Sequence, residues 1–315
     1  MNGCLIKICI IMKKLIFIFN FFYLCATSSC CQVEDGDVFQ PVIPYSLPAL
    51  ENNNLRVVSY NLLFEKTVPS ELDRRWVNRK EKVKQLFTNY SFDIIGTQEA
   101  LTSQVNDILS WKDWGRIGGD LPHGDIDCSF NEENEAVFYK KSRFEVLEEG
   151  NFWFSESPDK PGTYSWGATY PRMCTWGKFK EKTTGRIFYI YNSHFNVDAP
   201  QSRIESAKMI LNKVKAVAGE YPVICTGDLN SVPEEESVLT LLGDGTLKDS
   251  KLVATTIEGA GGTYHGFSSE ATTRLDYVMV TDKVGVNVYR AIDNELRTAR
   301  FGSDHLPVVV DVILK

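Results

Sequence analysis

Short runs of β-branched and aromatic residues recur along the chain, and each is typical of a strand. They cover Leu55–Leu63, Asp93–Glu99, Glu135–Lys140, Arg186–Phe195, Tyr221–Asp228, Leu275–Thr281 and Leu306–Leu314. Residues 143–182 carry Trp153, Trp166 and Trp176 without helical spacing, so we predict only β structure there.

Apolar residues recur at steps of three and four over residues 83–90 and 204–218, which predicts two amphipathic helices. Weaker patterns predict helices over Leu101–Trp111 and, entered through Pro233, over Glu234–Leu242. Strands and helices that alternate in this way predict an α/β sandwich, in which sheets pack together and helices cover the outside.

The first 31 residues are typical of an export signal. Lys13-Lys14 precede an apolar run, Leu15–Ala26, that is too short to span a bilayer, and Met12 is an alternative start. Small residues before Cys30 and Cys31 fit either ordinary cleavage or a bacterial lipoprotein. We therefore expect an exported protein that is periplasmic, extracellular or an outer-surface lipoprotein, with a membrane contact only through the lipid anchor.

Composition and charge indicate the domain organisation and limit the classes of binding partner. Residues 32–54 are rich in Pro and Asn and predict a flexible leader, whereas residues 55–315 have no linker or repeat and predict one domain. The formal charge is −7, and removal of the signal segment, which holds three lysines and no acid, leaves −10. This balance argues against a tight, sequence-independent nucleic-acid binder, although nucleic acid stays an alternative substrate.

Cysteine usage does not indicate a disulfide framework. Of eight cysteines, five lie in the signal segment, and only Cys128, Cys174 and Cys225 remain in the body. Their number is odd and their spacing is not that of a zinc site. Cys225 lies within an apolar run and is expected to be a small buried residue.

Polar residues follow several of the predicted strands. Asn61 and Glu99 each end an apolar run, and Asp228 and Asn230 point to one face because they are two residues apart. Alone, each is more typical of a turn, a helix cap or a solvated strand end. Asp276 lies inside an apolar strand, where a carboxylate is costly without a partner.

Two of the four histidines, His194 and His305, lie in these strand-end motifs beside acids or amides. Oxygen ligands with few cysteines favour a hard cation, Mg²⁺ or Mn²⁺, over zinc. Together the motifs predict a phosphate-ester hydrolase.

The ordered motifs resemble the endonuclease/exonuclease/phosphatase superfamily, which includes pancreatic-type deoxyribonuclease, exonuclease III and sphingomyelinases. They are Ser59-Tyr60-Asn61, Gln98-Glu99, Ser193-His194-Phe195-Asn196, Gly227-Asp228-Leu229-Asn230, Arg274-Leu275-Asp276-Tyr277 and Ser303-Asp304-His305. Residues 152–156 and 172–176 resemble its secreted bacterial branch. The resemblance implies a four-layer α/β/β/α sandwich of the deoxyribonuclease I type.

The resemblance also implies roles. Glu99, Asn61 and Asp304 would bind Mg²⁺ or Mn²⁺, and Asp228 and Asn230 would orient the attacking water and the phosphate. His305, held by Asp276, would act as general base or phosphate contact, although the base could equally be Asp228. His194 would stabilise charge on the phosphoryl group.

Substrate contacts are predicted less directly. Arg172 is the favoured phosphate-binding cation, with Arg203 and Arg274 as competitors and a structural ion pair as the alternative for each. Tyr264, His265 and Phe267 are expected to form a stacking wall or simply to pack.

The expected enzyme is a monomeric phosphoesterase, and a phosphodiester is favoured over a phosphomonoester. The rivals are a non-catalytic exported binding protein on the same sandwich and a surface glycan-binding module, which tryptophans on one exposed face would favour.

Overall fold

The protein is represented by a computed structural model that describes residues 47, 50, 54–65, 73–118, 133–294 and 301–315. The predicted signal segment, residues 1–31, lies outside the described residues. So does the predicted leader, residues 32–54, apart from Leu47, Leu50 and Asn54. Within the described residues, no helix is long and apolar enough to cross a membrane.

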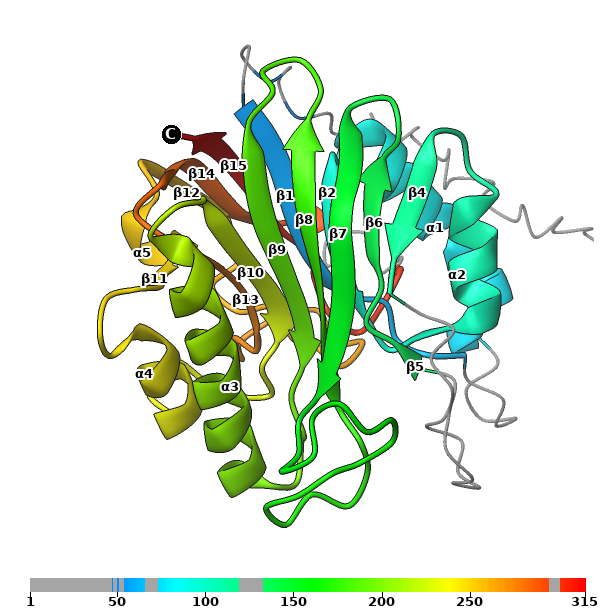
Figure 1. Cartoon of the computed structure of the whole chain (residues 1–315). Helices are drawn as coiled ribbons and strands as arrows, with labels where there is room; N and C mark the ends of the chain where they lie inside the picture. Colours follow the sequence, from blue (N-terminus) through cyan, green and yellow to red (C-terminus); the bar gives the residue numbers. More distant parts are fainter. Residues whose placement is uncertain (1–46, 48–49, 51–53, 66–72, 119–132, 295–300) are drawn as a thin grey trace, which may run out of the picture. The chain divides into compact units, whose positions relative to one another are not determined.

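Two large sheets form the centre of the structure (Figure 1). The first has the strand order β12-β14-β15-β1-β2-β6-β4, and the second has the order β11-β13-β10-β9-β8-β7. The strands of the first sheet are β12 (Thr256–Gly259), β14 (Val284–Ala291), β15 (Val308–Leu314), β1 (Asn54–Asn61), β2 (Ile94–Gln98), β6 (Val137–Lys140) and β4 (Trp114–Ile117). Those of the second are β11 (Lys248–Asp249), β13 (Asp276–Val280), β10 (Val223–Asp228), β9 (Ile187–His194), β8 (Met173–Glu181) and β7 (Phe144–Trp153).

Helices cover the outer face of each sheet, as Figure 1 shows. Helices α1 (Trp76–Asn89) and α2 (Thr102–Leu109) pack on the first sheet, and α3 (Pro200–Ala218) and α4 (Glu236–Leu242) pack on the second. A third apolar cluster, which includes Val57, Phe179 and Ile224, fills the space between the sheets. These three apolar layers confirm the predicted four-layer α/β/β/α sandwich.

The predicted elements are found with shifted ends, and the helices predicted over residues 83–90 and 204–218 both begin earlier in the chain. Helix α3, for example, begins at Pro200, because proline suits the first helical turn, whose N–H groups have no partner within the helix. The interpretation of residues 143–182 as purely β was wrong for residues 154–172, which form turns between β7 and β8. Strands β4, β12 and β14 were not predicted, and neither were the short elements α5 (Ser250–Val253), β3 (Ala100–Leu101) and β5 (Glu133–Asn134).

A buried polar bridge joins the two sheets. Asn192 of β9 donates to the Thr97 carbonyl at 2.8 Å, and its Oδ1 accepts from Gln98 Nε2 at 2.7 Å and Thr226 Oγ1 at 2.9 Å. The sheets meet closely here because Gly96 has no side chain. A Cβ atom at Gly96 would lie 2.0 Å from Thr226 Oγ1, so no other residue fits without displacement.

We predict that Asn192→Leu lowers the free energy of unfolding by at least about 2 kcal/mol, because buried partners such as Gln98 Nε2 would lose their hydrogen bond. Urea denaturation measures the loss. The control is Asn287→Leu in β14, a partly exposed position where the change should stay within about 0.5 kcal/mol. Equal stability of the two variants would show that the bridge does not stabilise the sandwich.

Candidate active site

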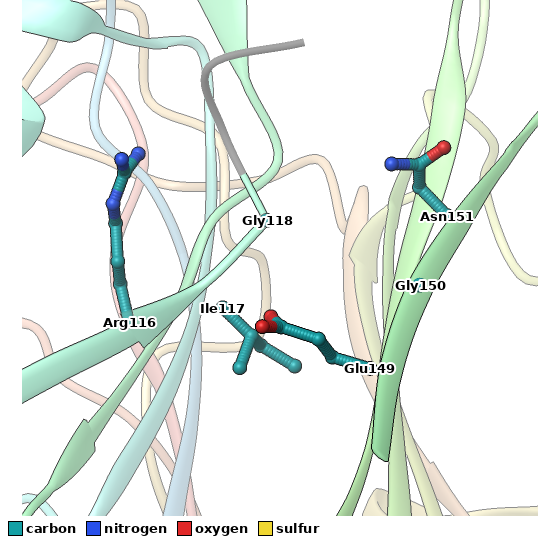
Figure 2. A pocket seen from close by; sticks show the side chains of 6 residues that line it. All are labelled: Arg116, Ile117, Gly118, Glu149, Gly150 and Asn151. Carbon is teal, nitrogen blue, oxygen red and sulfur yellow. The ribbon is translucent and has the colours of Figure 1, made fainter. Parts of the chain in front are cut away.

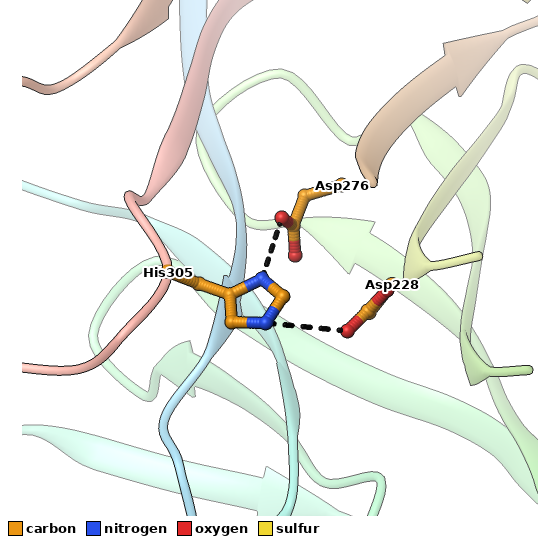
Figure 3. Close-up of side chains that lie close together, drawn as sticks. All are labelled: Asp228, Asp276 and His305. Atoms are coloured by element: carbon orange, nitrogen blue, oxygen red, sulfur yellow. Dashed lines mark hydrogen bonds and ion pairs between the residues drawn. The ribbon is translucent and has the colours of Figure 1, made fainter. Parts of the chain in front are cut away.

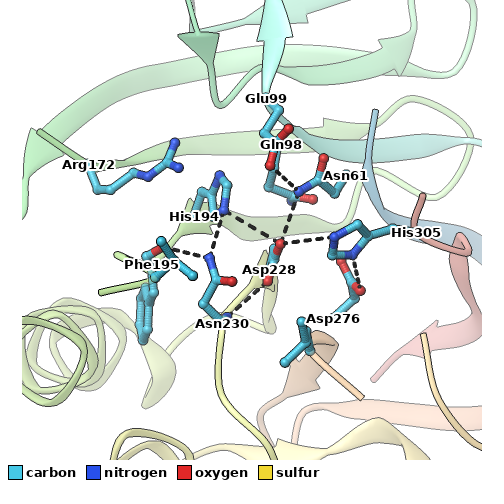
Figure 4. Close-up of polar contacts among 12 residues, drawn as sticks. Asn61, Gln98, Glu99, Arg172, His194, Phe195, Asp228, Asn230, Asp276 and His305 are labelled. Atoms are coloured by element: carbon cyan, nitrogen blue, oxygen red, sulfur yellow. Dashed lines mark hydrogen bonds and ion pairs between the residues drawn. The ribbon is translucent and has the colours of Figure 1, made fainter. Parts of the chain in front are cut away.

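Six strand ends bring the predicted residues to one edge of the sandwich (Figure 4). Strands β1 and β2 run parallel, as do β9 and β10, so Asn61, Glu99, His194 and Asp228 all follow or end a strand at the same edge. Strand β13 runs antiparallel to β10 with Asp276 opposite Asp228. His305 precedes β15, which pairs antiparallel with β1.

Asn61 is the centre of the polar contacts. Its Nδ2 donates to Glu99 Oε1 and to Asp228 Oδ2, both at 3.0 Å. Its Oδ1, the atom that a metal ion would need, accepts from the Leu63 N–H at 2.9 Å. The fully buried Asn61 side chain therefore orients two carboxylates in this arrangement.

Glu99 lies among other acids. Burial, followed by the nearby charges of Glu133 and Asp304, raises its pKa to about 7, although the Asn61 hydrogen bond opposes the shift. Its backbone has a φ of 61°, a left-handed conformation that is uncommon for a residue other than glycine. Convergent carboxylate oxygens are the donors that a hard divalent cation requires, so the residues around Glu99 fit Mg²⁺ or Mn²⁺.

Asp228 lies between the two histidines. The Asn230 N–H donates to Asp228 Oδ1 at 2.9 Å, and His194 Nε2 lies 3.5 Å from Asp228 Oδ2. Burial and then Asp276 raise the pKa of Asp228 to about 6. Burial, Arg172 and His305 lower the pKa of His194 well below its usual value, so this imidazole is neutral at pH 7.

Asp276 and His305 form a tight pair (Figure 3). His305 Nδ1 lies 2.8 Å from Asp276 Oδ2, and its Nε2 lies 3.7 Å from Asp228 Oδ2. Burial alone would lower the pKa of His305, but the carboxylates of Asp276 and Asp228 outweigh it and raise the pKa to about 10. His305 therefore carries a proton at neutral pH.

The ligand atoms of Asp228, Asp276 and His305 all lie within 4.8 Å of one another, as in a metal site. The Asp276–His305 contact, however, engages the Nδ1 atom of the ring. This geometry suits a carboxylate that orients an imidazole, and the Glu99 region suits a cation better.

Arg172 lies beside the site with its charge already compensated. Its Nη1 contacts Glu133 Oε2 at 2.5 Å and Glu135 Oε1 at 3.8 Å, while its Nε has no hydrogen-bond partner. Its guanidinium also lies 4.9 Å from the centre of the Tyr170 ring. Of the three predicted arginines, only Arg172 lies close enough to the site to lower the pKa of His194.

The other two arginines have structural partners. Arg203 donates to Glu235 at 2.8 Å, and Arg274 makes a bidentate pair with Asp249 at 2.6 and 2.7 Å. Arg203 and Arg274 thus both form structural ion pairs, which was the alternative to phosphate binding.

The predicted aromatic wall divides into two parts. Tyr264 is 38% exposed, and its ring centre lies 4.9 Å from that of His305. His265 is buried against Phe301, with ring centres 4.7 Å apart, and its Nδ1 accepts from the Phe267 N–H. Tyr264 is thus the member of the wall that offers an open surface beside the site.

A separate cavity of about 320 Å³ lies between the edge strands β4 and β7 (Figure 2). Its lining includes Arg116, Glu149 and Asn151 and shares no residue with the contacts described above. The tryptophans do not form an exposed face: three are buried (Trp76, Trp114 and Trp153) and three are partly buried (Trp111, Trp166 and Trp176). The exposed tryptophan face that would favour a glycan-binding module is therefore not found.

Two residues of the site have no counterpart in the sequence analysis. Glu133 binds Arg172 and helps to raise the pKa of Glu99. Burial raises the pKa of Glu135 to about 8, although Arg172 opposes the shift. Both belong to a run of acids, Glu132 to Glu135 with Asn134, that reads as solvated in the sequence, so no local signal distinguishes them.

We predict that the metal-free protein loses stability as the pH rises from 5 to 8. Glu99, Asp228 and Glu135 have folded pKa values raised to about 7, 6 and 8, so the folded state keeps protons that the unfolded state has released. His305 adds to this, because its stabilising contribution is complete below pH 6.5 and is lost as the pH rises toward 10. Burial lowers the pKa values of His194 and His265, and these two histidines oppose the trend below pH 6.5 only, so the loss is clearest between pH 6.5 and 8.

Urea denaturation in EDTA at pH 5, 6.5 and 8 measures this dependence. Glu135→Gln should make it shallower, and the exposed Glu145→Gln should leave it unchanged. A free energy of unfolding that rises between pH 6.5 and 8 would contradict the raised pKa values.

Comparisons place the chain among known proteins. The endonuclease/exonuclease/phosphatase family profile matches residues 58–305. The structure of a mannosyl-6-phosphatase from Bacteroides thetaiotaomicron is 31% identical, with a TM-score of 0.76 over 82% of this chain and 100% of that chain. A second B. thetaiotaomicron protein of the same family is also 31% identical, with a TM-score of 0.75 over 83% of this chain and 98% of that chain.

A more distant structure, the human nocturnin catalytic domain with a bound sulfate anion, shares the fold at 18% identity. Its TM-score is 0.63 over 84% of this chain and 95% of that chain. The profile match runs from β1 to His305 and so includes every motif on which the resemblance was based. The chain belongs to the endonuclease/exonuclease/phosphatase family.

Proposed function

We propose that this protein is a divalent-metal-dependent phosphoesterase that hydrolyses a phosphate ester by in-line attack of water. The observation that carries the proposal is the convergence of Glu99, Asp228 and the Asp276–His305 pair at one edge of the sandwich. Family membership agrees with a hydrolase of phosphate esters. A non-catalytic binding protein would not need these contacts.

The proposed cation site is centred on Glu99, with Asp304 as a further ligand and Asn61 as the residue that orients Glu99. When bound, Mg²⁺ or Mn²⁺ would neutralise charge on the phosphate and stabilise the leaving oxygen. Ionised Glu99 would be favoured by that cation, which reverses the effect of Glu133 and Asp304 on its pKa.

The pKa values divide the proton-transfer roles. Asp228, with a pKa of about 6, is ionised at pH 7 and can accept a proton from water, while Asn61 and the Asn230 N–H fix its two oxygens. Protonated His305 can donate a hydrogen bond to a phosphate oxygen but cannot act as a base. We therefore assign the role of general base to Asp228. We propose that neutral His194 hydrogen-bonds to the phosphoryl group.

The substrate that we propose is a small phosphorylated sugar, as a monoester or a diester. The similar mannosyl-6-phosphatase supports the monoester, whereas the sequence analysis favoured a diester. Among the described residues, Arg172 is bound by two glutamates and Arg274 by Asp249, so neither offers an unpaired charge for a polynucleotide backbone. Exposed Tyr264 offers a face on which a sugar ring could stack.

We expect turnover of an aryl phosphodiester or a hexose 6-phosphate to need Mg²⁺ or Mn²⁺ and to stop in EDTA. Glu99→Gln should abolish the metal response, and His305→Ala should lower kcat by about 10²- to 10⁴-fold, because it removes a proton-bearing contact to the phosphate. Asp276→Asn should lower kcat by less. Initial rates at saturating substrate measure these effects.

Glu145→Gln, an exposed change of the same chemistry on β7, is the matched control and should retain wild-type rates. Comparison of monoester with diester rates then distinguishes the two substrate classes. If the wild type neither turns over these substrates nor binds Mg²⁺ in calorimetry, the binding-protein alternative replaces the enzyme.

We also propose that the protein is exported and carries a lipid on Cys30. The support is the apolar run Leu15–Ala26, followed by the small residues Thr27, Ser28 and Ser29 before Cys30. Mass spectrometry of the mature protein should find a lipid-modified N-terminal Cys30, and Cys30→Ala should remove it. An unmodified mature N-terminus would indicate simple secretion instead.

A further inference from the structure

Arg79 of α1 lies buried behind the site, with a side chain that is only 1% exposed. A guanidinium group has five N–H donors. The Arg79 group makes five hydrogen bonds, and each ends on a backbone carbonyl oxygen. The acceptors are Leu62 (2.7 Å), Gly302 (2.6 Å), Leu63 (2.7 Å), Phe64 (3.3 Å) and Arg74 (2.6 Å).

Four of these acceptors lie in two segments, residues 62–64 and 302–304, which we call the site loops. The first loop follows Asn61, and the second contains Asp304 and precedes His305. Arg79 Nη1 bonds to both loops, at the Leu62 and Gly302 carbonyls. One planar group therefore fixes the distance between them.

The first site loop contacts both residues at the centre of the site. The Leu63 N–H donates to Asn61 Oδ1, and the Phe64 N–H donates to Glu99 Oε2 at 3.3 Å. Leu63 has a φ of 53°, a conformation that persists only where the surroundings hold it. Its carbonyl accepts from Gln104 Nε2 at 3.0 Å as well as from Arg79.

The second site loop is joined to the first by Ser303 Oγ, which donates to the Asn61 carbonyl at 2.7 Å. Among the described residues, no carboxylate makes an ion pair with Arg79. The acids whose charges act on its guanidinium include Asp304 and Glu99, so this positive charge lies behind the acids of the proposed cation site.

We infer that Arg79 is a positioning residue for metal binding: it holds the two site loops so that Glu99, Asp304 and His305 keep the spacing that the cation and the phosphate need. This inference rests on the proposed function. Lysine cannot replace arginine here, because an ammonium group has three donors at one point and cannot reach both loops and the Arg74 carbonyl.

The test compares Arg79→Lys with Arg56→Lys. Arg56 is equally buried, and it bonds to Asp311 and to the Tyr90 carbonyl, two partners that lie outside the site loops. Both variants should lose stability. Only Arg79→Lys should weaken Mn²⁺ binding in calorimetry, by about 10- to 100-fold, the range typical of residues that orient metal ligands.

Two further measurements exclude a purely structural effect. Arg79→Lys should lower kcat and leave KM for the substrate nearly unchanged, and amide hydrogen exchange of the metal-free protein should be faster at the site loops than in Arg56→Lys. If Arg79→Lys does not fold, Gln104→Met, which removes the second donor to Leu63, should weaken Mn²⁺ binding in the same direction by a smaller factor.

The outcomes separate the two proposals. Equal Mn²⁺ affinity and kcat in Arg79→Lys and Arg56→Lys would overturn the role of Arg79 while the phosphoesterase stands. A wild-type protein that binds no Mn²⁺ would overturn the proposed function, and the metal-positioning role of Arg79 would fall with it.

Discussion

The site depends on one buried contact between the two sheets. Asn192 connects β9 to the Thr97 carbonyl and to Gln98 of β2, and Thr226 of β10 completes the bridge. Because Gly96 allows this close approach, the ends of β2 and β10 lie near enough for Asn61 to bond to both Glu99 and Asp228. A buried polar network of this kind fixes the register of a sheet pair more narrowly than apolar packing does.

The same convergence buries several acids close together, where ionisation of each carboxyl group is unfavourable. Burial raises the pKa values of Glu99, Asp228 and Glu135 together. Ionisation of these groups therefore lowers the free energy of unfolding at the pH where a hydrolase needs ionised carboxylates. Such strain is typical of functional sites, which are arranged for a ligand and not for stability. A cation bound at Glu99 would favour the ionised form of that carboxylate.

Much of the fold could be predicted because runs of β-branched and aromatic residues, and apolar residues at helical spacing, are local patterns. The strand ends also identified Asn61, Glu99, Asp228 and His305, since each motif contains both its strand and its polar residue. Glu133 and Arg79 could not be predicted in this way. Arg79 is one of several basic residues in a helix, and its role depends on the Gly302 carbonyl, 223 positions away, which only the folded chain brings close.

Sequence also could not decide the charge of the two histidines, because their neighbours come from other strands. Burial and then Arg172 favour the neutral form of His194. Burial opposes the charged form of His305, but Asp276 and Asp228 outweigh it. Asp228 contacts both rings. One carboxylate therefore has a neutral imidazole on one side and a cationic imidazole on the other. That asymmetry is the basis on which we propose Asp228 as the general base.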